Sequence, residues 1–195
     1  MIQSWVQSEE EWVEDDWTMI VIERLNPIFA KTSPRFAKIT ISLEELVPMA
    51  VQQLSLLEFI HSKGLVHKGV KPDNFVMSDD KTKVYIIDFN KSKRYLDSEG
   101  NHVSFQTDNK LPKGLPLFHS LNYHKGIRSS RRDDLESLGY CWVYLLMGCL
   151  PWSKINRIKR RWSEYVRSVG YCKTNTTIEE LCKGLDLFLK CFDFL

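Results

Sequence analysis

The chain of 195 residues is long enough for one domain with a sizeable core, and its 43% hydrophobic and 12% aromatic residues fit an ordinary globular protein. Its 27 basic and 25 acidic residues leave a net charge of +2, which gives no global reason to expect nucleic acid or a membrane surface as partner. Five cysteines without paired or ligand-like spacing, no signal-peptide pattern and no apolar run of about 18 residues predict a cytoplasmic or nuclear protein with reduced thiols and no membrane partner.

The first predicted element is a β-hairpin near the N-terminus. Residues 1–17 are acidic and contain no Lys or Arg. Two short apolar segments, residues 4–6 and residues 17–22, flank this acidic stretch, and the second is rich in the aromatic and β-branched residues typical of strands. We therefore predict two short strands joined by a polar, acidic loop.

A long helix is predicted to begin after Ser42. Ser42 and Glu45 have the spacing of a capping box, in which each side chain accepts a hydrogen bond from the other residue's backbone. Gly64 is suited to the left-handed conformation that ends many helices. Between these signals, helical spacing is kept by Leu46, Ala50, Leu54, Leu57 and His61.

The remaining elements alternate between one strand, a long loop and further helices. Residues 83–89 form an apolar strand that ends in Asp88, and residues 90–130 are irregular and rich in Gly and Pro. Helical periodicity returns in residues 133–148 and again in residues 178–192. This pattern predicts an α+β fold that is mainly helical.

Residues 67–74, which read His-Lys-Gly-Val-Lys-Pro-Asp-Asn, contain the clearest chemical pattern in the chain. Together with several other blocks they resemble the casein kinase and vaccinia-related kinase superfamily, and the blocks occur in the family's order. In chain order the blocks are residues 57–63, 67–75, 84–89, 130–140, 150–152 and 181–184. The resemblance implies a protein-kinase-like C-lobe over residues 26–195, preceded by residues 1–25 as a remnant of the N-lobe strands and the hinge.

The resemblance also implies a shortened domain. No Gly-rich loop, no strand with a phosphate-pairing Lys and no helix with its partner Glu precedes Trp5. The C-terminus stops before the last helical segment that such domains carry. We therefore expect the front of the N-lobe to be missing.

The catalytic loop departs from the family at its central residue. The family pattern H-R-D-x-K-x-x-x-N places an Asp where this chain has Gly69, and that Asp accepts the proton of the substrate hydroxyl. Loss of a general base costs on the order of 10²–10⁴ in rate. His67, Gly69, Lys71 and Asn74 thus form a degenerate loop in which we expect no catalytic residue and interpret His67 as a core histidine.

Nucleotide binding, if retained, is expected to be weak. By resemblance, Lys71 matches the phosphate-supporting position, while Asn74 and Asp88 match the metal-binding positions and remain as a vestigial metal site. Glu23 and Leu25 fall in the hinge beside the adenine pocket. Asn74 and Asp88 alone would hold Mg²⁺ poorly without substrate phosphates. We therefore expect no resident cofactor and at most weak binding of ATP and magnesium.

At two further positions the chain is compared with the family: Leu117 departs from the family pattern and Asp134 matches it. In residues 114–120, Leu117 stands where casein kinases have an Arg that helps bind an anion on primed substrates. Asp134 matches an acidic residue of the family's central helix that holds the backbone of the catalytic loop. The resemblance therefore implies an intact C-lobe scaffold without its chemistry.

Taken together, these features predict a pseudokinase that acts as a protein-binding scaffold or regulatory subunit. If the strands that normally pair with residues 17–22 are missing, an unpaired edge remains at Trp17, Met19 and Val21. We expect this edge to contact a partner protein or a second copy of the chain.

Two alternatives remain open at this stage. The first is a weak or conditional serine/threonine kinase that needs a partner. The second is a nucleic-acid adaptor that uses a basic patch after Trp152, and the same patch would also suit an acidic partner. The patch is formed by Lys154, Arg157, Lys159, Arg160 and Arg161. A solvated helix face is the simpler interpretation of this patch.

Overall fold

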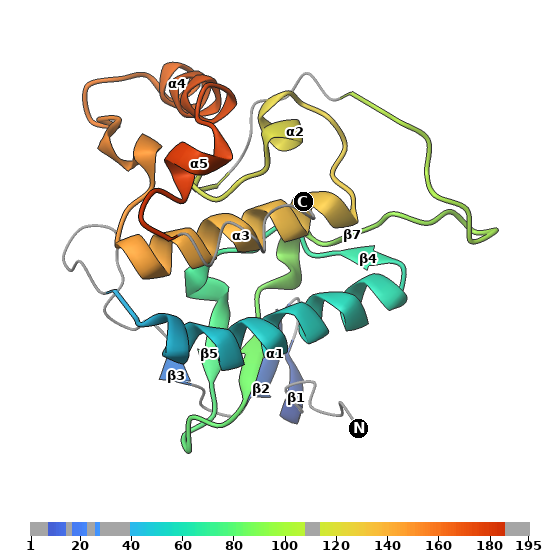
Figure 1. The fold of residues 1–195 in the computed structure, drawn as a ribbon. Coiled ribbons are helices and arrows are strands. Elements are labelled where there is room, and N and C mark those ends of the chain that lie inside the picture. Colours follow the sequence, from blue (N-terminus) through green and yellow to red (C-terminus); the bar gives the residue numbers. More distant parts are fainter. Residues whose placement is uncertain (1–7, 15–16, 23–25, 28–39, 108–113, 186–195) are drawn as a thin grey trace.

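The structure is a computed structural model that describes residues 8–14, 17–22, 26–27, 40–107 and 114–185 (Figure 1). The helices are α1 Leu43–Ser62, α2 Leu121–His124, α3 Arg131–Met147, α4 Trp162–Thr174 and α5 Ile178–Leu181, with short 3₁₀ helices η1 Pro72–Asn74, η2 Phe89–Lys91 and η3 Pro151–Lys154. The strands are β1 Ser8–Glu14, β2 Trp17–Ile22, β3 Asn26–Pro27, β4 Leu65–Val66, β5 Phe75–Met77, β6 Val84–Ile86 and β7 Lys93–Arg94. This arrangement confirms the predicted α+β, mainly helical fold.

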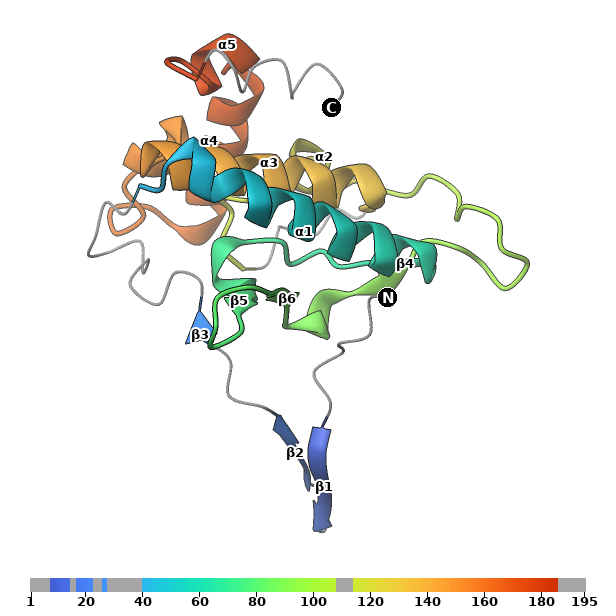
Figure 2. The same ribbon diagram turned by 60° about the horizontal axis from the view of Figure 1, so that its bottom comes forward.

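The N-terminal hairpin is present, and its first described strand covers residues that the sequence predicted as an acidic loop. β1 and β2 pair antiparallel, with Trp12 opposite Met19 and Glu10 opposite Val21. The acidic stretch that was predicted to be a loop is therefore a strand, because a run of glutamates does not prevent the backbone hydrogen bonds of a two-stranded sheet. Residues 4–6 lie outside the described residues. In Figure 2 the hairpin extends away from the helical body.

Helix α1 has the two ends that its sequence predicts. The Ser42 N–H donates to Glu45 Oε2 at 2.8 Å, and the Glu45 N–H donates to Ser42 Oγ at 3.2 Å, which completes the capping box. At the other end Gly64 has a φ of +74° and its N–H donates to the His61 carbonyl at 3.0 Å. A left-handed residue at this position is the usual helix stop.

The core lies between α1, α3 and the β5–β6 hairpin (Figure 1). Leu57, Leu138 and Phe75 are completely buried there. A polar bond joins the two long helices inside this core, where the indole N–H of Trp142 donates to Gln53 Oε1 at 2.7 Å. These contacts fix α1 against α3 and so position the segment that follows α1.

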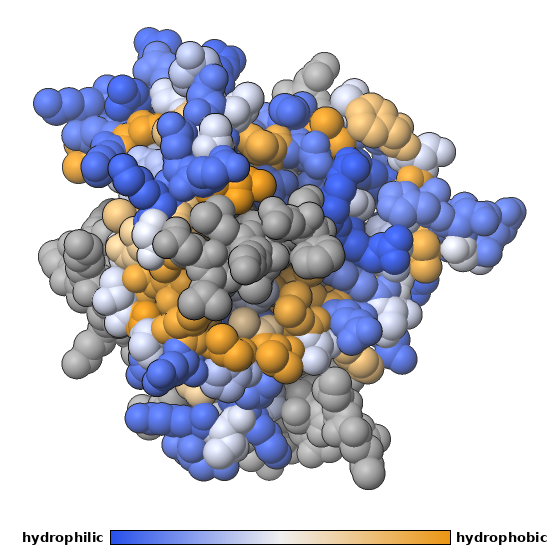
Figure 3. All heavy atoms as spheres, viewed as in Figure 1, coloured by the Kyte–Doolittle hydropathy of each residue, from blue (hydrophilic) through white to orange (hydrophobic). Residues whose placement is uncertain are grey.

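One face of α1 keeps an apolar surface. Leu43, Val47, Val51 and Leu54 are exposed, and Figure 3 shows hydrophobic atoms gathered over the first half of this helix. Among the described helices, none combines the length and the apolar character that crossing a membrane requires. The four described cysteines are free thiols; Cys141 and Cys182 are buried, whereas Cys149 is exposed.

The C-terminal third differs from its prediction in two places. The helical pattern of residues 178–192 yields only the four-residue α5, since the chain reaches Gly184 with a φ of +88°; residues 186–192 lie outside the described part. Helix α4 was not predicted at all.

The basic residues before α4 do not form the predicted helix face. Lys154 ends η3, and Arg157, Arg160 and Arg161 lie in the exposed turn that leads into α4. The side chain of Arg160 donates through Nη1 to the Asn156 carbonyl at 3.1 Å, which stabilises a non-helical turn.

Candidate functional site

The degenerate loop runs between β4 and η1 and is built on a buried histidine. His67 is fully buried, and its ring meets the ring of Phe89 edge-on at 4.8 Å between centroids. Nε2 donates to the Ile87 carbonyl at 3.2 Å, and Nδ1 accepts from the Gly69 N–H at 3.2 Å. One nitrogen donates and the other accepts, so the ring is neutral, in keeping with the lowering of the His67 pKa by burial. His67 thus lies in the core, with both ring nitrogens hydrogen-bonded.

Asp134 holds the backbone of this loop in place. Its carboxylate accepts from the N–H of His67 at 2.7 Å and from the N–H of Lys68 at 2.8 Å, and His61 Nε2 lies 2.9 Å from the same group. Asp134 itself is 1% exposed. These bonds keep Lys68 at a φ of +62°, a conformation that a non-glycine residue rarely adopts. The structural role expected for Asp134 is therefore confirmed.

Gly69 takes part in the loop through main-chain atoms alone. Its N–H donates to His67, and its carbonyl accepts from Asn74 Nδ2 at 2.7 Å. A Cβ added to Gly69 would lie 3.3 Å from the His67 ring and 3.4 Å from Asn74 Nδ2. The position therefore has room for a side chain after shifts of a few tenths of an ångström, but this chain places no carboxylate there.

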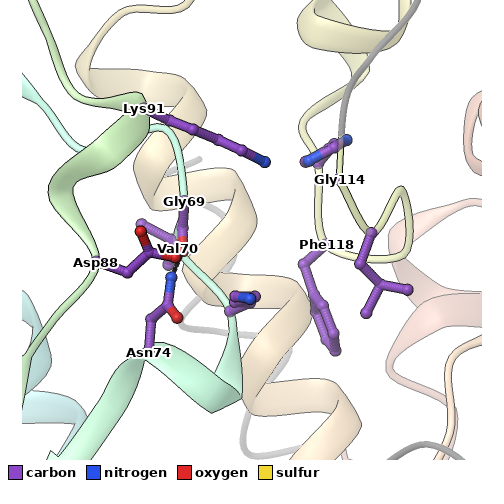
Figure 4. A pocket seen from close by; sticks show the side chains of 10 residues that line it. Gly69, Val70, Asn74, Asp88, Lys91, Gly114 and Phe118 are labelled. Atoms are coloured by element: carbon purple, nitrogen blue, oxygen red, sulfur yellow. Dashed lines mark hydrogen bonds between the residues drawn. The ribbon is translucent and has the colours of Figure 1, made fainter.

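A small cavity of about 60 Å³ adjoins the loop (Figure 4). It is lined by Gly69, Val70, Lys71, Asn74, Asp88, Lys91, Gly114, Leu115, Phe118 and His119. Gly69, Lys71 and Asn74 come from the loop and η1, and Asp88 comes from the segment after β6, so the structure brings these two segments together at the cavity. Ligand pockets for drug-sized molecules usually measure about 300–1,000 Å³, so the described part of this cavity is too small to enclose a nucleoside.

The sequence did not predict that Lys91 and His119 line the cavity. Lys91 extends across it toward Gly114 (Figure 4), and burial together with Lys71 lowers the Lys91 pKa while Asp88 raises it. His119 borders the cavity from the opposite segment, and burial lowers its pKa to about 2, so its ring is neutral at pH 7. Lys91 and His119 lie 17 or more positions after the loop of residues 67–74. A local sequence pattern therefore could not assign them to the cavity.

The segment after Gly114 is fixed to the core by a buried lysine. Lys173 Nζ donates to the Pro116 carbonyl at 3.1 Å and to the His119 carbonyl, and it lies 4.9 Å from the centre of the Trp152 ring. Burial lowers the Lys173 pKa well below its ordinary value. Leu117 is 6% exposed and belongs to the core, so its side chain offers nothing to an anion on a substrate.

The cavity is poorly suited to a resident magnesium ion. Asp88 is the only carboxylate among the described residues that line it. Lys71 and Lys91 add two ammonium groups that oppose a divalent cation. Across the described part of the chain, His, Cys, Asp and Glu form no cluster of three or more that could hold a metal.

The other residues named from the sequence lie away from the cavity or outside the described ranges. Trp17, Met19 and Val21 are on β2, and Glu23 and Leu25 lie outside the described residues. The basic residues are exposed; the Arg157 guanidinium lies 5.2 Å from the centre of the Trp162 ring.

Comparison with known families gives one match that spans nearly the whole chain. The model described as Protein kinase domain matches residues 3–186. This range contains the loop of residues 67–74, the cavity and the segment that Lys173 holds.

Proposed function

Because the chain belongs to the protein kinase domain family, we propose that it is a kinase-like protein that has lost phosphoryl transfer and acts by binding another protein. Gly69 carries this proposal. In active protein kinases the Asp at this place accepts the proton of the attacking hydroxyl. The loop around Gly69 has its hydrogen bonds formed, so the missing carboxylate is a change of side chain within an ordered loop.

Neighbouring carboxylates do not replace the missing group. Asp73 is on η1 but is not among the residues that line the cavity, and a base must come within hydrogen-bonding reach of the hydroxyl. Asp88 does line the cavity, at the place where the family holds its metal ion. An aspartate in contact with a metal ion is a poor proton acceptor. We therefore expect a rate lower by about 10²–10⁴ than that of an intact site, before any other loss is counted.

Phosphoryl transfer can be measured directly with radiolabelled ATP, magnesium and casein as a generic acceptor. We expect the chain to give no more labelled product than a sample without protein. The control is Asp88→Ala, which removes the remaining acidic metal ligand and should leave this background unchanged. Transfer by the native chain that disappears in Asp88→Ala would support the alternative, a weak or conditional serine/threonine kinase.

The N-terminal hairpin is the surface that we propose for a protein partner. β1 and β2 form a two-stranded sheet, so within the described residues each strand has one side without a paired strand. Exposed edges of this kind readily accept a further strand from another chain. The resemblance to the casein kinase and vaccinia-related kinase superfamily implies that further strands pair with this sheet in related domains. A partner protein or a second copy would add its strand to this sheet.

Light scattering after size exclusion and a pull-down from cell extract test this surface together. We expect self-association or capture of a partner, and we expect Met19→Lys with Val21→Lys to abolish it, because charged residues on an edge strand oppose further pairing. Lys154→Ala with Arg157→Ala is the matched control on the basic turn and should bind as well as the native chain. A monomer that captures nothing would remove the proposal.

The exposed basic turn keeps a nucleic-acid adaptor as the second candidate. Lys154, Arg157, Arg160 and Arg161 are all exposed and lie within eight consecutive residues of the chain. Binding through such a turn would weaken steeply with salt, since each phosphate contact releases a counterion. An RNA or DNA affinity that does not change with salt concentration would exclude it.

A further inference from the structure

A second cavity, which we call the α3–α5 cavity, is lined by residues of α2, α3, η3, the α4–α5 turn and α5. In Figure 1 these elements lie above α3, whereas α1 lies below it. The volume of the α3–α5 cavity is about 450 Å³, and among the described residues it shares no lining residue with the cavity beside Gly69. Pockets for drug-sized ligands measure about 300–1,000 Å³, so this cavity can enclose a small molecule.

The lining of the α3–α5 cavity is mainly apolar. Trp152 and Tyr140 are buried aromatic residues of the lining, and their rings meet edge-on at 5.0 Å between centroids. Leu135 and Leu181 add aliphatic surface, and Ile178, which is 43% exposed, adds an apolar side chain next to solvent. Removing such surface from water contributes about 25 cal/mol per Å², so the cavity favours an apolar occupant.

The charged groups inside this lining already have partners. Lys173 donates to two backbone carbonyls and lies 4.4 Å from the centre of the Tyr140 ring. Glu136 Oε1 accepts from the Leu121 N–H and from the Tyr140 hydroxyl, each at 2.7 Å. Burial lowers the Lys173 pKa and the charge of Glu136 raises it, so these two opposite charges interact within the lining.

Arg132 is the remaining charged residue of the lining, and its side chain is 65% exposed. Its Nε lies 3.9 Å from Asp133 Oδ2, and within the described part of the chain no hydrogen bond uses its Nη atoms. Asn122 also lines the cavity, and its side-chain amide can supply two further N–H donors. With Lys173 and Glu136 offsetting each other, Arg132 leaves the lining with one positive charge and with donors that suit an anionic group.

We propose that the α3–α5 cavity binds a small molecule that has an apolar body and one carboxylate, with the body against Trp152 and Leu135 and the carboxylate on Arg132. A guanidinium group matches a carboxylate through two parallel hydrogen bonds. A cationic ligand is disfavoured, because Arg132 and Lys173 both repel it. The site goes beyond the proposed function and is independent of it, since no residue of the loop 67–74 or of the hairpin takes part.

Isothermal titration calorimetry of the full chain with octanoate, octan-1-ol and octylammonium tests the site, because the three probes share one alkyl chain and differ in charge. We expect octanoate to bind at one saturable site, octan-1-ol to bind more weakly and octylammonium to bind most weakly. Arg132→Gln should weaken octanoate binding by about 10- to 100-fold, as expected for loss of a hydrogen bond between charged groups. The same substitution should leave the affinity for octan-1-ol unchanged.

Arg131→Gln is the matched control, since Arg131 is the adjacent exposed arginine and does not line the cavity. Val51→Glu is a second control, on the exposed apolar face of α1. Both variants should bind octanoate like the native chain. Loss of binding in Val51→Glu without loss in Arg132→Gln would place the acid on α1 and overturn the proposal. Absence of saturable octanoate binding, or octylammonium binding as tight as octanoate, would also overturn it. Urea unfolding curves establish that each variant is folded.

Discussion

Replacing Asp134 by Asn should destabilise the whole domain, because this carboxylate serves three buried donors. An asparagine oxygen in the place of Oδ2 still accepts from His61 and from the His67 N–H, but its amide nitrogen then faces the Lys68 N–H. One charge-assisted bond is lost, worth about 1.5–3 kcal/mol. The other two lose the charge that roughly doubles their strength, about 1 kcal/mol each. The free energy of unfolding should fall by about 3–5 kcal/mol.

Urea unfolding at pH 7, followed by the fluorescence of the buried tryptophans, measures this change. Asp97→Asn is the matched control, because Asp97 also accepts from two backbone N–H groups, those of Glu99 and Asn101, but lies in an exposed turn where water can replace them. We expect a loss below about 1 kcal/mol for the control. If Asp134→Asn costs no more than Asp97→Asn, the reasoning about buried donors is wrong.

The remaining predictions concern pH and one helix end. Burial lowers the pKa of His119 to about 2 and that of His124 to about 4, from an ordinary 6.5, so below pH 6.5 the unfolded chain binds more protons than the folded one. The free energy of unfolding should therefore decrease as the pH falls from 6.5 to 4, by up to about 1.4 kcal/mol per pH unit for each histidine. His119→Phe should remove the contribution of one histidine to this slope in urea titrations at several pH values, and an unchanged slope would refute the assignment. Gly64→Ala forces a Cβ to within 3.3 Å of Leu96 Cδ1 at a φ of +74°, whereas Gly100→Ala has similar backbone strain and open space. Both should lose about 1–2 kcal/mol from strain, and calorimetry should find the larger loss for Gly64→Ala.

The elements that the sequence predicted correctly depend on signals within a few residues. Ser42 and Glu45 are three positions apart, and Gly64 comes directly after the last turn of α1. Asp88 follows its strand by two residues, as expected for a side chain presented at a strand end. Such signals act through backbone hydrogen bonds that close locally, so no knowledge of the tertiary fold is required.

Other features were missed because their cause lies elsewhere in the chain. The sequence of β1 is typical of a charged loop, and it forms a strand because it pairs with β2. Helix α4 contains a periodic apolar set, Tyr165, Val169 and Cys172. The basic residues before it are a more prominent pattern, and the sequence placed the helix there instead. Lys91 and Lys173 acquire their roles from contacts with residues 114–119, which are distant in sequence.

The loop of residues 67–74 keeps its shape through backbone hydrogen bonds. Every hydrogen bond of residue 69 that shapes the loop uses its N–H or its carbonyl, and Asp134 holds the two residues before it by their backbone. The side chain at residue 69 therefore contributes nothing to the shape of the loop. A glycine there leaves these backbone hydrogen bonds in place. The family match over residues 3–186 therefore shows the fold, and phosphoryl transfer has to be measured directly.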